Sequence, residues 1–166
     1  MYPLFVTMRT GDNKIPALGP EMRLGQGFDG TFSTLVTHLQ TIMAKGLISV
    51  MLFGVVYDKD ERGSIADDAY TPVIKSTAAL RKELQELLVA CDVCIYHVVD
   101  YGRTLKRLMN ISLAYAKAGD HMVCPSDMMD NRIGAIRQIF NENGFEHVSI
   151  MAYTSKKASV MYAPFR

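Results

Sequence analysis

Strand-length apolar runs alternate with segments of helical periodicity along the chain, and this alternation constrains the fold more than any other feature. The apolar, β-prone runs cover residues 2–8, 48–56, 88–98, 121–126 and 148–154. Between them, apolar residues recur at helical spacing, and glycines follow these segments at Gly46, Gly119 and Gly144. The order β-α-β-α-β-α-β-α-β is typical of a parallel sheet whose strands are joined by right-handed helical crossovers.

The remaining local signals refine this pattern. The segment from Gly11 to Gly30 is rich in glycine and proline and is predicted to be a long loop. Thr71 and Pro72 fit the N-cap and first helical position of the second helix. We expect a single domain over residues 1–166, because this length is typical of one domain and suffices for a sizeable core.

Charge and composition exclude several classes of protein. The net charge of +1 favours neither nucleic acid nor an anionic membrane as a partner. No apolar run reaches the length of a transmembrane helix, and the first residues lack the basic and apolar regions of a signal peptide. Three cysteines, an odd number, are typical of a reducing compartment, so we expect a cytoplasmic protein.

The last predicted strand leads into a segment with candidate chemistry. Lys156 and Lys157 follow it directly, and Ser159, Tyr162 and Arg166 come next. Sites in parallel sheets lie at the carboxyl ends of strands. A lysine desolvated there can lose its proton and attack a carbonyl. Composition alone favours a plainer interpretation, in which the lysine pair is a solvated strand end.

Cys91 and Cys94 form a C-x-x-C, a weak hint of redox or zinc chemistry. Residues three apart on a strand point to opposite faces, so these two thiols are badly placed to bind one ion. Two core cysteines are the better interpretation. Asp92, Cys94 and Tyr96 share the other face, and a buried acid such as Asp92 needs a partner, for which Lys156 is a candidate.

The segment M-A-Y-T-S-K-K-A-S-V-M-Y-A-P-F-R resembles the Schiff-base lysine segment of the porphobilinogen synthase (5-aminolevulinate dehydratase) family, M-S-Y-S-A-K-[FY]-A-S-x-[FY]-Y-G-P-F-R. The resemblance implies that Lys156 is the imine-forming lysine, Tyr162 the active-site tyrosine and Arg166 the arginine that binds the substrate carboxylate. Lys157 departs from the family, which has an aromatic residue there. On a strand, the side chains of Lys156 and Lys157 leave opposite faces, so only one can enter the site.

Residues Leu87 to Cys94 resemble the segment L-L-V-A-C-D-V-C-L-C-x-Y-T-S-H-G-H-C-G of the animal enzymes. This implies that Asp92 is the active-site aspartate and Cys94 the first zinc cysteine. Tyr96 stands in place of the second cysteine, and no third follows Gly102. Because zinc needs at least three protein ligands, Cys94 is a lone remnant of the zinc set, and we expect neither tightly bound zinc nor another cofactor.

A third match, P-S-D-M-M-D, ends at Asp130. Ser126 and Asp127 follow a predicted strand, where a hydroxyl and a carboxylate can orient an amine or a water molecule. The alternative is that Ser126 or Asp130 caps the next helix. Both roles are compatible if different residues fill them.

The resemblance covers nearly the whole chain but only part of the family sequence. The family's N-terminal arm is absent, as is everything after the fifth strand, including a second Schiff-base lysine. It therefore implies a partial (β/α)₈ barrel, the N-terminal half, with about five parallel strands and four helices. The alternative fold is a flattened flavodoxin-like sheet.

The full family enzyme condenses two 5-aminolevulinates to porphobilinogen in haem biosynthesis. We expect this chain to be catalytically impaired on its own, with 5-aminolevulinate or a similar keto acid as ligand. The alternative is a non-catalytic relative that binds or assembles. In both cases we expect an oligomer or a subunit of a larger assembly, without nucleic acid and without membrane insertion.

Overall fold

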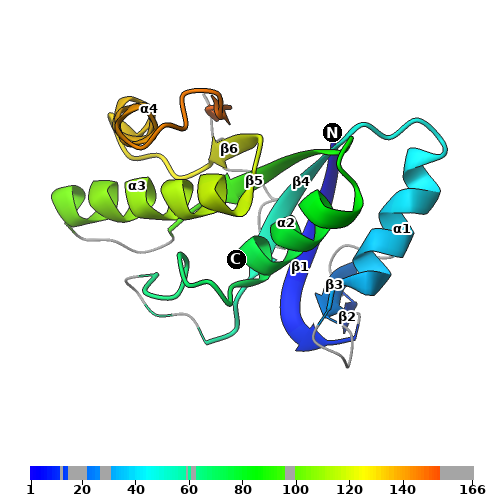
Figure 1. The fold of residues 1–166 in the computed structure, drawn as a ribbon. Coiled ribbons are helices and arrows are strands. Elements are labelled where there is room, and N and C mark those ends of the chain that lie inside the picture. Colours follow the sequence, from blue (N-terminus) through cyan, green and yellow to red (C-terminus); the bar gives the residue numbers. More distant parts are fainter. Residues whose placement is uncertain are drawn as a thin grey trace.

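The computed structural model of the chain describes residues 1–11, 13–14, 22–26, 31–58, 60, 63–95 and 100–153. The five predicted strands and four predicted helices are all present in the predicted order (Figure 1). The strands are β1 (Tyr2–Thr10), β4 (Ser49–Val55), β5 (Leu88–Val93), β6 (Met122–Pro125) and β7 (Ser149–Ile150). The helices are α1 (Ser33–Met43), α2 (Pro72–Glu83), α3 (Tyr101–Ala118) and α4 (Arg132–Glu142).

Two short strands lie in the segment that was predicted to be a loop, and that prediction is wrong at both. β3 (Met22–Gln26) pairs in parallel with β1, and β2 (Asn13–Lys14) pairs antiparallel with β3. Gly25 explains the misinterpretation. A Cβ atom at this position would collide with the backbone oxygens of Gly11 and Arg9. The glycine therefore permits a close approach of two backbones within a sheet, where the sequence pattern indicated a turn.

The order of strands along the sheet is β2-β3-β1-β4-β5-β6-β7. On the side of β1 away from β3, the sheet continues in chain order through β4, β5, β6 and β7, and each neighbouring pair is parallel. Right-handed crossovers between such strands place every helix on the same face of the sheet. A flavodoxin-like sheet reverses its order and carries helices on both faces. The strand order therefore supports the partial barrel and excludes the flattened alternative.

The main core lies between this face of the sheet and the helices. Val6, Leu52 and Cys91 are fully buried there from the sheet. Leu39, Leu108 and Phe140 are fully buried from the helices. Thr71 and Pro72 occupy the predicted N-cap and N1 positions of α2, and Gly119 ends α3 in the left-handed region, at φ 106°. No described helix is long and apolar enough to cross a bilayer.

The opposite face of the sheet, which we call the inner face, has a much smaller apolar cluster. Met51, Ala90 and Cys124 are buried in it, because Phe53, Met122 and Tyr153 pack against them. Strand pairing aligns Met51 with Ala90, Ala90 with Met122, and Asp92 with Cys124. Met151 on this face is 36% exposed. The inner face is therefore only partly covered by the residues that the structure describes.

Asp120 is a buried carboxyl in the helix-side layer, between α2 and β5. It is 4% exposed, and its Oδ1 accepts a hydrogen bond from the Thr77 hydroxyl at 2.9 Å. The same hydroxyl lies 3.5 Å from the Cys91 thiol. Burial raises the pKa of Asp120 from 3.8 to about 7, although hydrogen bonds from Cys91 and Thr77 and the charge of Arg81 oppose the rise. At a given pH, the Asp120 carboxyl is therefore protonated to a larger extent in the folded chain than in the unfolded chain.

This raised pKa predicts how stability changes with pH. Below about pH 4 the acid is protonated in both the folded and the unfolded chain, so its contribution to stability is complete. As the pH rises to about 7 the contribution is lost, at up to about 1.4 kcal/mol per pH unit. Urea unfolding of Asp120→Asn should show a free energy that depends less on pH over this window. Asp130→Asn, at an exposed position, is the control. An unchanged pH dependence in Asp120→Asn would show that Asp120 titrates normally.

Candidate functional site

The carboxyl ends of β5 and β6 bring three of the predicted site residues to the inner face. Asp92 pairs with Cys124 in the ladder, and the Ser126 N–H donates to the Val93 carbonyl at 3.0 Å just beyond it. Strand alternation then places Asp92, Cys94 and Ser126 on the same side of the sheet. Asp92 and Ser126 are half-buried and Cys94 is exposed. A carboxylate and a hydroxyl thus lie on neighbouring strands at the edge where parallel sheets carry their sites.

Tyr153 also lies on the inner face, although the sequence did not predict it as a site residue. Its N–H donates to the Pro125 carbonyl at 3.5 Å, so the chain after β7 still follows β6. Its hydroxyl donates to Met51 Sδ at 3.4 Å, which means that the ring reaches across the inner face to β4. The only sequence signal was alternation, since Met151 and Tyr153 have the same parity on the last predicted strand.

The electrostatics of the inner face favour neutral groups around Asp92. Burial, followed by the negative charges of Asp92, Cys124 and Cys94, raises the pKa of Tyr153 to about 12. Burial, followed by the charges of Asp92 and Asp120, raises the pKa of the Cys124 thiol to about 12. At neutral pH the Tyr153 phenol is therefore a hydrogen-bond donor, and the Cys124 thiol is protonated and a poor nucleophile.

Asp127 lies next to Ser126 in the chain but has different surroundings. It is 6% exposed, and its Oδ1 accepts the Met129 N–H at 2.9 Å within the β6–α4 turn. Arg132 Nε lies 3.8 Å from the same oxygen. The N-cap of α4 is Asn131, with φ 61° and no capping side-chain hydrogen bond, so the prediction that Ser126 or Asp130 caps this helix is wrong. Asp127 stabilises the turn instead.

The predicted residues of the last segment lie outside the described residues. These are Lys156, Lys157, Ser159, Tyr162 and Arg166. β7 is shorter than predicted, with two residues paired to Met122 and Val123. The Met151 N–H extends this pairing with a 2.9 Å bond to the Val123 carbonyl. Tyr153, the last described residue, precedes Lys156 by three positions, so the roles of these residues stay predictions.

The cysteines are distributed as strand alternation predicts. Cys91 is fully buried on the helix side, while Cys94 is exposed beyond the end of β5. The interpretation as core cysteines therefore holds for Cys91 and is wrong for Cys94.

Among the described residues, no three His, Cys, Asp or Glu side chains gather as a metal site. Asp100 caps α3 by accepting the Arg103 N–H at 3.0 Å. The described donor set does not fit a catalytic zinc ion.

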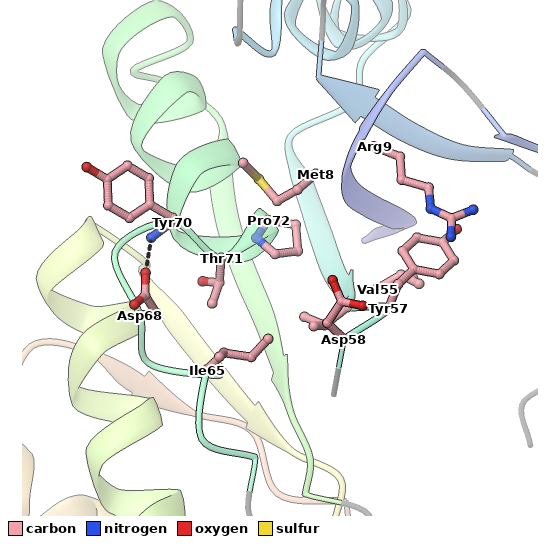
Figure 2. A pocket seen from close by; sticks show the side chains of 11 residues that line it. Met8, Arg9, Val55, Tyr57, Asp58, Ile65, Asp68, Tyr70, Thr71 and Pro72 are labelled. Carbon is pink, nitrogen blue, oxygen red and sulfur yellow. Dashed lines mark hydrogen bonds between the residues drawn. The ribbon is translucent and has the colours of Figure 1, made fainter. Parts of the chain in front are cut away.

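A second candidate is a cavity of about 420 Å³ at the carboxyl ends of β1 and β4, beside the start of α2 (Figure 2). Two of its charged groups already have partners within the chain. The Arg9 guanidinium lies over the Tyr57 ring at 3.5 Å, and Asp68 accepts the Tyr70 N–H at 2.7 Å. Met8, Val55 and Ile65 add apolar lining. The inner face, with its Asp92 and Tyr153 pair, is the stronger candidate for chemistry.

Comparison with known proteins gives one consistent result. The family model "Delta-aminolevulinic acid dehydratase" matches residues 1–166. The enzyme of that name from Bos taurus is 39% identical over 184 aligned positions, which cover 100% of this chain and 54% of the relative. The one from Methanothermus sociabilis is 35% identical, again over 100% of this chain and 54% of the relative. The chain thus spans about half the length of the curated relatives it matches.

A solved structure matches in three dimensions as well. It is the crystal structure of delta-aminolevulinic acid dehydratase (porphobilinogen synthase) from Toxoplasma gondii ME49 in complex with the reaction product porphobilinogen. The TM-score is 0.89 at 31% sequence identity, over 99% of this chain and 50% of the other. The described fold therefore corresponds to half of that chain.

The donor set generates a prediction about zinc. After loading with zinc and extensive dialysis, the protein should retain well below one zinc per chain by elemental analysis, because the described residues offer Cys94 too few neighbouring ligands. The matched variants are Cys94→Ala and Cys91→Ala, and neither should change the zinc content. One zinc per chain that is lost in Cys94→Ala and kept in Cys91→Ala would contradict this prediction.

Proposed function

Because the chain belongs to the delta-aminolevulinic acid dehydratase family, a family of TIM-barrel enzymes, we propose that it carries an imine-forming half of a porphobilinogen-forming site. One observation carries the proposal. Asp92 and Tyr153 both lie on the inner face, the charge of Asp92 helps to raise the pKa of Tyr153, and Lys156 follows Tyr153 by three positions. The ligand is 5-aminolevulinate or a closely similar keto acid.

The proposed chemistry begins with the amine of Lys156. Its nitrogen adds to the keto carbon of the ligand, and the resulting carbinolamine loses its hydroxyl as water once that oxygen is protonated, which leaves an imine. Asp92, the half-buried carboxyl that β5 carries on the inner face, exchanges that proton. Ser126 orients the departing water, and Asp127 contributes through the turn that holds Ser126 in place.

The remaining proposed roles come from the family resemblance. Arg166 binds the ligand carboxylate through a two-pronged guanidinium contact, and Tyr162 closes over the ring-forming site. These residues lie outside the described part of the chain, so the sequence match alone supports their roles.

A second candidate function is binding without turnover. Two observations favour it: the described residues lack a zinc donor set, and the inner face is partly exposed. Such a protein would bind a keto acid or pack against a complementary barrel segment, and would form no porphobilinogen. A turnover assay for porphobilinogen separates the two functions, because only the first yields product.

The choice between the two lysines is testable by reductive trapping. With 5-aminolevulinate and borohydride, the wild-type chain should acquire a stable adduct, which peptide mass spectrometry should assign to Lys156. Lys157→Ala is the matched control and should trap normally, whereas Lys156→Ala should trap nothing. An adduct that persists in Lys156→Ala and disappears in Lys157→Ala would reverse the assignment.

The inner face also supports a proposal about assembly. Parallel sheets are usually covered on both faces, yet Met151 and Cys94 on this face are exposed. We propose that the sheet buries this face against a partner, either a second copy or a larger complex.

Light scattering and dye binding test the assembly proposal. The isolated chain should be larger than a monomer, or else should bind 1-anilinonaphthalene-8-sulfonate at the exposed inner face. A compact monomer that binds no dye and unfolds cooperatively would rule out the need for a partner.

A further inference from the structure

Helix α4 holds β7 at both of its ends through two arginines. The Arg137 guanidinium donates to the Val148 carbonyl at 2.8 Å and to the Glu146 carbonyl at 3.2 Å, just before the strand. The Arg132 guanidinium donates to the Tyr153 carbonyl at 3.0 Å, just after it. β7 pairs two residues with β6, and backbone hydrogen bonds from Met151 and Tyr153 continue this contact. The arginines add three hydrogen bonds from α4 to residues 146–153.

The surroundings of Arg132 are unusual for a charged side chain. The side chain is only 11% exposed, and Nη1 donates to the Met129 carbonyl at 3.0 Å. Asp127 lies 3.8 Å from its Nε. A buried guanidinium is costly unless it is paired and hydrogen-bonded, and its donors have a fixed planar geometry. Arg132 therefore joins the β6–α4 turn, Asp127 and the backbone of Tyr153 in one rigid contact.

We propose that Arg132 is a positioning residue for the imine-forming amine. This inference rests on the proposed function. Arg132 fixes the carbonyl of Tyr153, and Lys156 follows three residues later. Three residues span at most about 11 Å, so the fixed carbonyl limits where the lysine can be. The same contact holds Tyr153 on the inner face, where its hydroxyl donates to Met51 Sδ at 3.4 Å and where Asp92, the proposed proton-exchanging group, also lies.

Arg137 provides a matched control within the same helix. It also donates to backbone carbonyls of the β7 segment, but at the end remote from Lys156. Losing either arginine removes two hydrogen bonds to main-chain oxygens, so both changes should reduce stability. Only the loss of Arg132 should release the segment that precedes the lysine.

The experiment compares Arg132→Met and Arg137→Met in the full chain. Time-resolved borohydride trapping over a range of 5-aminolevulinate concentrations gives a maximal rate and a half-saturating concentration, and urea unfolding gives stability. In Arg132→Met the maximal trapping rate at Lys156 should fall about 10-fold or more, because small displacements of a reacting group are costly. The half-saturating concentration should stay unchanged. In Arg137→Met the maximal rate should match the wild type despite a loss of stability.

Two outcomes overturn the inference in distinguishable ways. If wild type traps 5-aminolevulinate and both variants trap it equally well, or lose rate in proportion to stability, Arg132 is only structural and the proposed function stands. If wild type traps nothing at Lys156, the proposed function fails and this inference fails with it. Should Arg132→Met not fold, Arg132→Lys replaces it. That variant keeps the charge but lacks the planar donor pair, so its maximal rate should be lower than the maximal rates of the wild type and of Arg137→Met.

Discussion

Beyond β1, the sheet continues through β4, β5, β6 and β7, which are all parallel and in chain order, and right-handed crossovers then leave the helices only one face to cover. Nearly all of the buried apolar surface consequently lies between that face and α1 to α4, where Leu39, Leu52 and Phe140 are fully buried. No described helix covers the inner face, and the described residues form only the small cluster around Met51 and Cys124 there. Stability and candidate chemistry are thereby separated onto opposite sides of one sheet.

This separation explains why polar groups with very different roles occur on neighbouring residues. Cys91 and Asp92 are adjacent in β5, yet Cys91 lies near Asp120 and Thr77 in the helix-side layer, whereas Asp92 pairs with Cys124 and lies on the inner face. The side chains of Ser126 and Asp127 likewise have different surroundings, because the chain leaves β6 here and turns towards α4. The helix-side groups stabilise the fold, and those on the inner face remain accessible to a ligand.

Much of the fold could be predicted because its signals are local. Apolar runs, helical spacing and the glycine at 119 placed the five main strands and four helices, and alternation separated Cys91 from Cys94. The errors occurred where tertiary contacts decide. Gly25 allows two backbones to meet, which no local pattern distinguishes from a turn. Tyr153 reaches Met51 across the sheet, 102 positions away in sequence. Arg132 is buried by contacts with Met129 and Tyr153, although its sequence context suggests an ordinary surface position.

Thiol labelling tests the two-sided arrangement most directly, because each cysteine reports on a different environment. Burial raises the pKa of Cys91 well above 9.0 and that of Cys124 to about 12, and Cys94 is exposed. A short pulse of N-ethylmaleimide on the native chain, read by peptide mass spectrometry, should modify Cys94 and leave Cys91 and Cys124 unmodified until the protein is unfolded. Modification of Cys91 as fast as that of Cys94 would contradict the proposal that the helices cover one face of the sheet and leave the other accessible.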